Sequence, residues 1–203
     1  MRVSGRQGTE QERFQHLFDV ISSERFLCKQ GLGNELPFFI CPFPPEKAVA
    51  MQRLQKQLIT KLEQAGVRVL AINLYDLAIE LLQARDIWQQ TLDIEAQTSK
   101  EELLELLQGV LDPATHLVPT IADKMAQTEF DVLFIGGVGE VYPFLRSHTI
   151  LNNLQRVAKE QPTVLFFPGD YIQDLESGAS LELFGRLRDD KYYRAFNIFD
   201  REV

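Results

Sequence analysis

The chain has 203 residues and a formal net charge of −8, and 45% of its residues are hydrophobic while 25% are charged. This length and composition are typical of a globular protein with a sizeable core. The negative charge disfavours direct nucleic-acid binding, which depends on Lys and Arg neutralising phosphates. No apolar run reaches the roughly 18 residues needed to cross a bilayer, and the polar start of the chain is unlike a signal peptide. We therefore expect a cytoplasmic protein with no membrane partner.

The two cysteines, Cys28 and Cys41, are not arranged as a C-x-x-C motif. This spacing gives no indication of a zinc or thioredoxin-type site. Two thiols in a chain of this size fit a reducing cytoplasm, where we expect both to be packed as small hydrophobic residues.

The first third of the chain predicts a helix followed by a strand. Residues 1–8 are small and polar and are expected to be disordered, whereas residues 9–203 are expected to form a single α/β domain. Thr9 and Glu12 form a capping-box pattern that begins the helix. The apolar run Leu36–Ile40, bounded by Gly and Pro, predicts the strand.

The rest of the chain alternates helical apolar stripes with short unbroken apolar runs. The expected helices cover 46–65, 74–90, 99–109, 117–125 and 142–159, and the expected strands cover 67–73, 131–135, 163–167 and 195–199. We expect Pro168-Gly169 to close the third of these strands and a short helix to precede the last. Unbroken apolar strands separated by helices predict an open, mostly parallel sheet of about five strands with helices on both faces.

The segment VLFIGGVGEVYPFLRSH, residues 132–148, combines a strand, a glycine turn and a predicted helix start. These are the parts of a phosphate-binding loop. A Walker A loop also needs a Gly-Lys pair, and the chain contains none. The dinucleotide pattern G-x-G-x-x-G fails as well, because Gly137 and Gly139 are followed by Tyr142. We interpret these glycines as residues that allow a tight turn and close strand-to-helix packing.

Ligands of open α/β sheets bind outside the carboxyl ends of the strands, and several polar residues are expected near those ends. The candidate interface or ligand-binding residues are Asn34, Glu35, Gly136, Gly139, Glu140, Tyr142, Arg146, His148, Asp170 and Tyr171. Their spacing matches no metal-binding or catalytic-triad signature, so no catalytic residue, metal or cofactor is predicted. His148 has an alternative interpretation as a core residue, because it shares a helical stripe with Phe144 and Leu151.

Five segments resemble the BrxB family of bacterial BREX phage-defence systems. They are GLGNELPFFICPF, VLAINLYDL, VLFIGGVGEVYPFLRSHTILNNLQ, PTVLFFPGDY and LFGRLRDDKYYRAF. The resemblance covers the chain from about residue 10 to 199 and implies a component of a defence complex rather than a chemistry, since it carries over no catalytic residues. It implies a PglZ-type alkaline-phosphatase-like protein as the direct partner, with other BREX subunits as further partners.

Two hypotheses of different classes follow. The first is a non-enzymatic structural or adaptor component of a BREX complex. The second is a degenerate nucleotide or small-ligand sensor that uses the crevice at the strand ends, and an uncharacterised hydrolase is a more remote alternative. The order of strand, glycine turn and helix also resembles a nucleoside-triphosphatase core without its Walker A loop, which is an analogy of fold alone.

Overall fold

The computed structural model describes residues 8–33, 35–174, 178–189 and 195–202. At its centre lies a sheet whose parallel strands run in the order β2-β3-β4-β1-β7. Their bounds are Phe38–Phe43 for β1, Val69–Asn73 for β2, Val132–Gly136 for β3, Thr163–Asp174 for β4 and Phe196–Asn197 for β7. The open α/β sheet predicted from the sequence is therefore confirmed, including its fifth parallel strand near the C-terminus.

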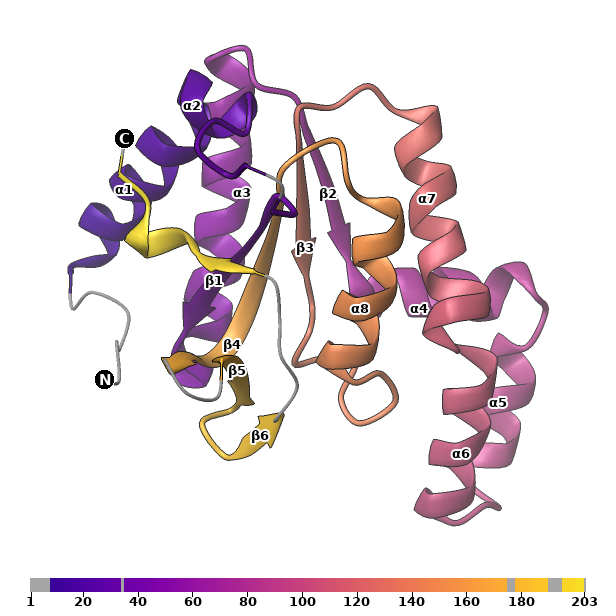
Figure 1. Cartoon of the computed structure of the whole chain (residues 1–203). Coiled ribbons are helices and arrows are strands. Elements are labelled where there is room, and N and C mark those ends of the chain that lie inside the picture. Colours follow the sequence, from indigo (N-terminus) through magenta and orange to yellow (C-terminus); the bar gives the residue numbers. More distant parts are fainter. Residues whose placement is uncertain (1–7, 34, 175–177, 190–194, 203) are drawn as a thin grey trace.

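Helices cover both faces of this sheet (Figure 1). One face carries α1 (Glu10–Ser22), α2 (Glu24–Leu27) and α3 (Ala48–Gln64). The other carries α4 (Leu74–Ala84), α7 (Val118–Gln127) and α8 (Ser147–Val157), and α5 (Trp88–Glu95) and α6 (Lys100–Val110) extend beyond these helices, away from the sheet. Short helical turns at Pro45–Lys47, Pro113–Leu117 and Ile198–Asp200 complete the helical part. No helix in the described ranges is both long and apolar enough to cross a membrane.

Alternation along each strand divides the core between the two faces. Phe38 and Ile40 of β1 pack into the cluster under α4, α7 and α8. Phe39 and Cys41 of the same strand pack into the cluster under α1 and α3. Successive strand residues point to opposite faces, so an unbroken apolar run is what a strand covered on both faces requires.

Side-chain caps fix where the helices begin. The hydroxyl of Thr9 accepts from Glu12 N at 3.2 Å, and the Glu12 carboxylate accepts from Thr9 N at 2.7 Å. The same reciprocal capping box joins Ser99 and Glu102 at the start of α6. Both predicted capping boxes are confirmed.

Two predicted boundaries in the first half need correction. The first strand begins at Phe38 rather than at Leu36. The helix expected over 74–90 ends at Ala84, and a separate helix starts at Trp88. Asp86 between them has φ 56°, a left-handed conformation that breaks an α-helix.

Two predictions in the last third are also wrong. The helix expected from Tyr142 begins only at Ser147, and Tyr142 itself precedes Pro143, a position that disfavours helical backbone. The strand expected to close at Pro168-Gly169 continues to Asp174 and pairs with β5 (Gly178–Leu183), which pairs with β6 (Leu187–Asp189). This antiparallel hairpin replaces the expected tail helix, of which residues 190–194 lie outside the described residues.

The two cysteines differ in their surroundings. Cys41 is fully buried in β1, and desolvation raises the pKa of its thiol to about 12. It is the small hydrophobic residue that the sequence predicted. Cys28 is exposed after α2, so the prediction of a packed thiol is wrong there.

Candidate functional site

The carboxyl ends of the parallel strands meet at one edge of the sheet, together with the loop 137–146 and the β5–β6 hairpin (Figure 1). Gly136 is the last residue of β3 and lies beside Asn73, the last residue of β2. The Asn73 side chain accepts hydrogen bonds from the backbone N–H groups of Tyr75 and Asp76 and so caps α4. Two adjacent strands thus deliver the glycine loop and a helix start to the same place.

The glycines of this loop are surrounded by protein. Gly137 has φ 75°, and a Cβ there would lie 2.9 Å from Asn73 Cγ and 3.0 Å from Leu74 N. A Cβ at Gly139 would lie 2.9 Å from Pro168 Cγ and 3.0 Å from Phe184 Cε1. A Cβ at Gly136 would lie 3.1 Å from Gln55 Oε1 of α3. These contacts agree with the predicted tight turn and close packing.

The backbone of the loop also differs from a phosphate cradle. Glu140 N and Val141 N both donate to the carbonyl of Gly137, at 3.1 and 3.3 Å, so these N–H groups are turned inward. The next helix begins at Ser147, well after the last glycine. In a phosphate-binding loop, free N–H groups and a helix N-terminus converge on one anion, and here the two are separated along the chain.

A groove lies where the segment before α8 faces the β5–β6 hairpin. It has a volume of about 360 Å³ and is lined by Tyr142, Arg146, Ser147, His148, Leu183, Arg186 and Leu187. Arg146, Arg186 and Leu187 are exposed, and Leu187 retains 41% of its accessible surface. The ring of Tyr142 meets that of Phe184 edge to face, with 6.0 Å between centroids. Cationic and apolar side chains thus share one concave surface.

The structure brings three of the predicted residues, Tyr142, Arg146 and His148, together in this groove. Glu140 is exposed at the same edge, where its carboxylate accepts from Gln52 Nε2 of α3 at 2.7 Å. Asp170 is exposed in β4 and lies opposite Glu182 in the antiparallel register of β4 and β5.

Three predicted residues lie elsewhere or have another role. Tyr171 is buried, and its hydroxyl donates to the carbonyl of Ala195 at 2.6 Å, so it joins β4 to the segment before β7. Glu35 precedes β1 and therefore lies near the amino ends of the strands, opposite the groove. Asn34 lies outside the described residues.

Sequence reasoning missed the hairpin half of the groove, namely Leu183, Arg186 and Leu187. The predicted tail helix is wrong there, and Ser180-Leu181-Glu182-Leu183 alternates polar and apolar residues, which indicates a strand. Within the described ranges, no three His, Cys, Asp or Glu side chains gather in a way that could hold a metal ion. The groove is suited to binding anionic and apolar groups, through two guanidinium groups beside leucine and tyrosine.

Comparisons with known proteins agree with the resemblance seen in the sequence. Residues 70–198 match the profile of a family described as BREX protein BrxB. The chain belongs to the BrxB family. A BREX protein BrxB from Bacillus cereus (strain H3081.97) is 31% identical over 194 residues, which cover 94% of this chain and 97% of that relative. A BREX protein BrxB from Escherichia coli O9:H4 (strain HS) is 27% identical over 186 residues, 92% of this chain and 90% of that relative.

No solved structure matches the chain. Membership in the BrxB family makes this chain a BREX-system component, and the description of the family names no chemical activity. Any role for the groove therefore has to be argued from its own residues.

Proposed function

We propose that this BrxB-family chain is a non-enzymatic adaptor of a BREX phage-defence complex and that its groove is the surface that holds a protein partner. The observation that carries the proposal is the composition of the groove. Arg146 and Arg186 stand beside Tyr142, Leu183 and Leu187 on one concave surface. Arginine and tyrosine are enriched at the energetically important positions of protein interfaces, where apolar residues surround them.

The glycine loop supports the same proposal. Its glycines pack against Asn73, Pro168 and Phe184, and two of its N–H groups bond within the loop. Its sequence is therefore explained by folding, without a bound phosphate. The groove residues are among those that remain available at the carboxyl edge.

The groove calls for a partner surface of particular chemistry. Two exposed guanidinium groups suit carboxylates opposite them, and the exposed Leu187 suits an apolar side chain. Among BREX proteins, the resemblance favours the PglZ-type protein as this partner. The overall charge of −8 repels an acidic partner at long range, so the attraction has to come from the groove itself.

The test is co-expression with the PglZ-type protein of the same operon, followed by size-exclusion chromatography with light scattering. We expect a complex of defined stoichiometry. The double variant Arg146→Glu with Arg186→Glu should weaken it by at least about tenfold, since like charges would then face the partner's carboxylates. Arg156→Glu is the matched control, because Arg156 is exposed in the last turn of α8, away from the groove.

Separate elution of the two wild-type proteins would reject the PglZ-type partner. Equal binding by the groove variant and the control would reject the groove as the contact surface. The groove variant must retain the circular dichroism spectrum of the parent for this comparison. Its exposed positions make loss of the fold unexpected.

A second candidate function is a sensor of a nucleotide or another small anionic ligand. The pair Arg146 and Arg186, with His148 beside them, would also suit a phosphate group in a groove of about 360 Å³. Calorimetry with ATP, GTP and cyclic nucleotides, each with magnesium, tests it. Heat of binding that the Arg146→Glu with Arg186→Glu variant loses would favour this sensor, and no heat at millimolar ligand would remove it.

A further inference from the structure

A second, smaller pocket lies on the other helical face, far along the chain from the groove residues. It is formed by the turn between α1 and α2, the loop that follows α2, the start of β1 and the residues after Asp200. Its walls include the apolar side chains of Val20, Phe26, Leu32 and Phe39, and its volume is about 20 Å³. That space admits one small polar group and excludes a nucleotide.

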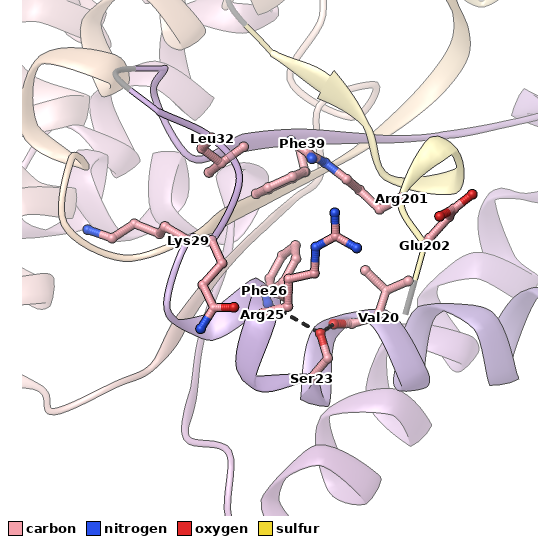
Figure 2. A pocket seen from close by; sticks show the side chains of 10 residues that line it. Val20, Ser23, Arg25, Phe26, Lys29, Leu32, Phe39, Arg201 and Glu202 are labelled. Carbon is pink, nitrogen blue, oxygen red and sulfur yellow. Dashed lines mark hydrogen bonds between the residues drawn. The ribbon is translucent and has the colours of Figure 1, made fainter.

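Two arginines from opposite ends of the chain point into this pocket (Figure 2). Arg25 comes from α2, and Arg201 follows the last helical turn, Ile198–Asp200. Lys29 also lines the pocket but extends away from the two guanidinium groups, and its Nζ lies 3.9 Å from Glu160 Oε2. The centre of the pocket is therefore dominated by two guanidinium groups.

Arg201 is held by aromatic rings. Its guanidinium carbon lies 4.3 Å from the ring centroid of Phe196 and 5.4 Å from that of Phe39. Such stacking fixes the plane of a guanidinium group while leaving its N–H groups free to donate. The geometry is thus preorganised for an acceptor.

The hydrogen bonding of Arg201 is incomplete. Its Nη2 is buried and has no hydrogen-bond partner among the described residues. The pKa of the Arg201 guanidinium is lowered from its ordinary value, mainly by burial and to a lesser extent by the positive charge of Arg25. Buried donors in native proteins are nearly always satisfied, and two cations brought together without an anion repel each other.

Neither arginine forms an ion pair with an acidic side chain in the described part of the chain. Glu202 lines the pocket but is exposed, and its carboxylate points away from the guanidinium groups (Figure 2). The pocket therefore combines Arg201, which the aromatic rings hold in place, with the exposed Arg25 and a small space beside them.

We propose that this pocket binds a single carboxylate that carries a short apolar stem, as in propionate or the side chain of aspartate or glutamate. A carboxylate is planar and accepts from guanidinium groups through two oxygens. The apolar walls, Phe26, Leu32 and Phe39, suit the methylene stem of such a side chain.

This site is separate from the groove and does not rest on the proposed function. Its test uses the full chain alone, with propionate as the probe, because propionate combines one carboxylate with a short apolar stem. Propionamide, which has the same shape and no charge, is the matched control ligand. Nitrogen-edited NMR of the arginine Nε–H groups reports on Arg25 and Arg201 directly, at constant ionic strength.

We expect saturable shifts of the Arg25 and Arg201 signals with propionate and none with propionamide. Arg25→Gln should weaken propionate binding about tenfold, since one charge-assisted hydrogen bond is lost. Arg201→Lys, which keeps a cation over the aromatic rings but removes the fork, should weaken it similarly. Arg156→Gln should leave it unchanged.

Three results would overturn the proposal. The first is the absence of saturable shifts at either arginine, and the second is an equal response to propionamide. The third is tighter binding of inorganic phosphate than of propionate, which would assign the pocket to a different anion. Arg25→Gln leaves the stacked Arg201 in place, so the test does not depend on a variant that removes this packing.

Discussion

Asn73 and Gly137 occupy the same corner of the sheet, because the Asn73 side chain fills the space that a Cβ on residue 137 would need. The side-chain oxygen Oδ1 of Asn73 caps α4 by accepting from two backbone N–H groups, which fix this side chain. Gly137 adopts a left-handed backbone conformation, with φ 75°, and has no side chain that would collide with Asn73. The glycine and the cap therefore depend on each other, and the loop that resembles a phosphate cradle is a structural joint between β2, β3 and α4.

Gly137→Ala should destabilise the protein by about 1–3 kcal/mol. A left-handed conformation costs a non-glycine residue about 1–2 kcal/mol, and the new methyl group would also displace the Asn73 cap. Urea unfolding measures the change. Gly109→Ala is the control, because Gly109 lies inside α6 with no atom within 4 Å of the place its new methyl group would take, and it should stabilise by about 0.5–1 kcal/mol. If Gly137→Ala did not lower the free energy of unfolding relative to Gly109→Ala, the proposed dependence of the Asn73 cap on Gly137 would be contradicted.

The central strands and the capped helices could be predicted because their signals are local. The apolar run of β3 predicts a strand and the Thr9–Glu12 capping box predicts a helix start, each from only a few neighbouring residues. The predicted start of α8 is wrong because the apolar stripe continues backwards through the separate turn that contains Pro143. Propensity and periodicity give opposite answers there, and the proline prevails.

The sites could be predicted only in part, because each is built from distant segments. To predict the groove, one would have to know that β4 continues past Pro168. There Phe184 N donates to the Pro168 carbonyl at 2.9 Å and holds the hairpin in place. The pocket of Arg25 and Arg201 joins the two ends of the chain. No local pattern predicts such a juxtaposition, which follows from tertiary packing.

Asp131→Asn should reduce stability at neutral pH by about 1 kcal/mol or less, because the Arg68–Asp131 pair is partly exposed. Asp131 Oδ2 accepts from Arg68 N at 2.8 Å and from Arg68 Nε at 3.1 Å, and Oδ1 accepts from Nη2 at 2.8 Å, which ties the start of β2 to the start of β3. The side-chain hydrogen bond from Arg68 lowers the pKa of Asp131 below its ordinary value of 3.8.

The pH dependence follows from that direction. A lowered folded-state pKa gives stabilisation that is complete above the ordinary pKa and is lost as the pH falls through the folded value. The difference between Asp131→Asn and the parent should therefore be present at pH 7 and shrink below about pH 4. Thermal unfolding over pH 2–7 measures it. Asp123→Asn, an exposed change on α7, is the control. A difference that stays constant with pH would show that the carboxylate charge is not its source.

The two thiols should differ sharply in reactivity. Cys28 is exposed, whereas Cys41 is fully buried with its pKa raised to about 12 by desolvation. The thiolate is the reactive form, so a disulfide reagent at pH 8 should modify Cys28 alone in the native protein and both cysteines in denaturant. The variant Cys28→Ser should then show no reaction until it unfolds. Rapid labelling of Cys41 in native Cys28→Ser would contradict the burial of β1.

Thr163→Val should stabilise the protein by about 0.5–2 kcal/mol, which is an unusual direction for a core substitution. Thr163 is fully buried at the start of β4, and its hydroxyl has no hydrogen-bond partner among the described residues. An unsatisfied buried hydroxyl costs about 1–3 kcal/mol, and valine replaces it with a methyl group of similar volume. The backbone N–H of residue 163 still donates to the Pro37 carbonyl, so strand pairing is kept.

Thr91→Val is the matched control: Thr91 is also buried, but its hydroxyl donates to the Ile87 carbonyl at 2.9 Å, so its loss should destabilise by about 0.5–1.5 kcal/mol. Urea unfolding of the two variants should therefore move in opposite directions, and a destabilised Thr163→Val would mean that its hydroxyl stabilises the edge where β1, β3 and β4 begin.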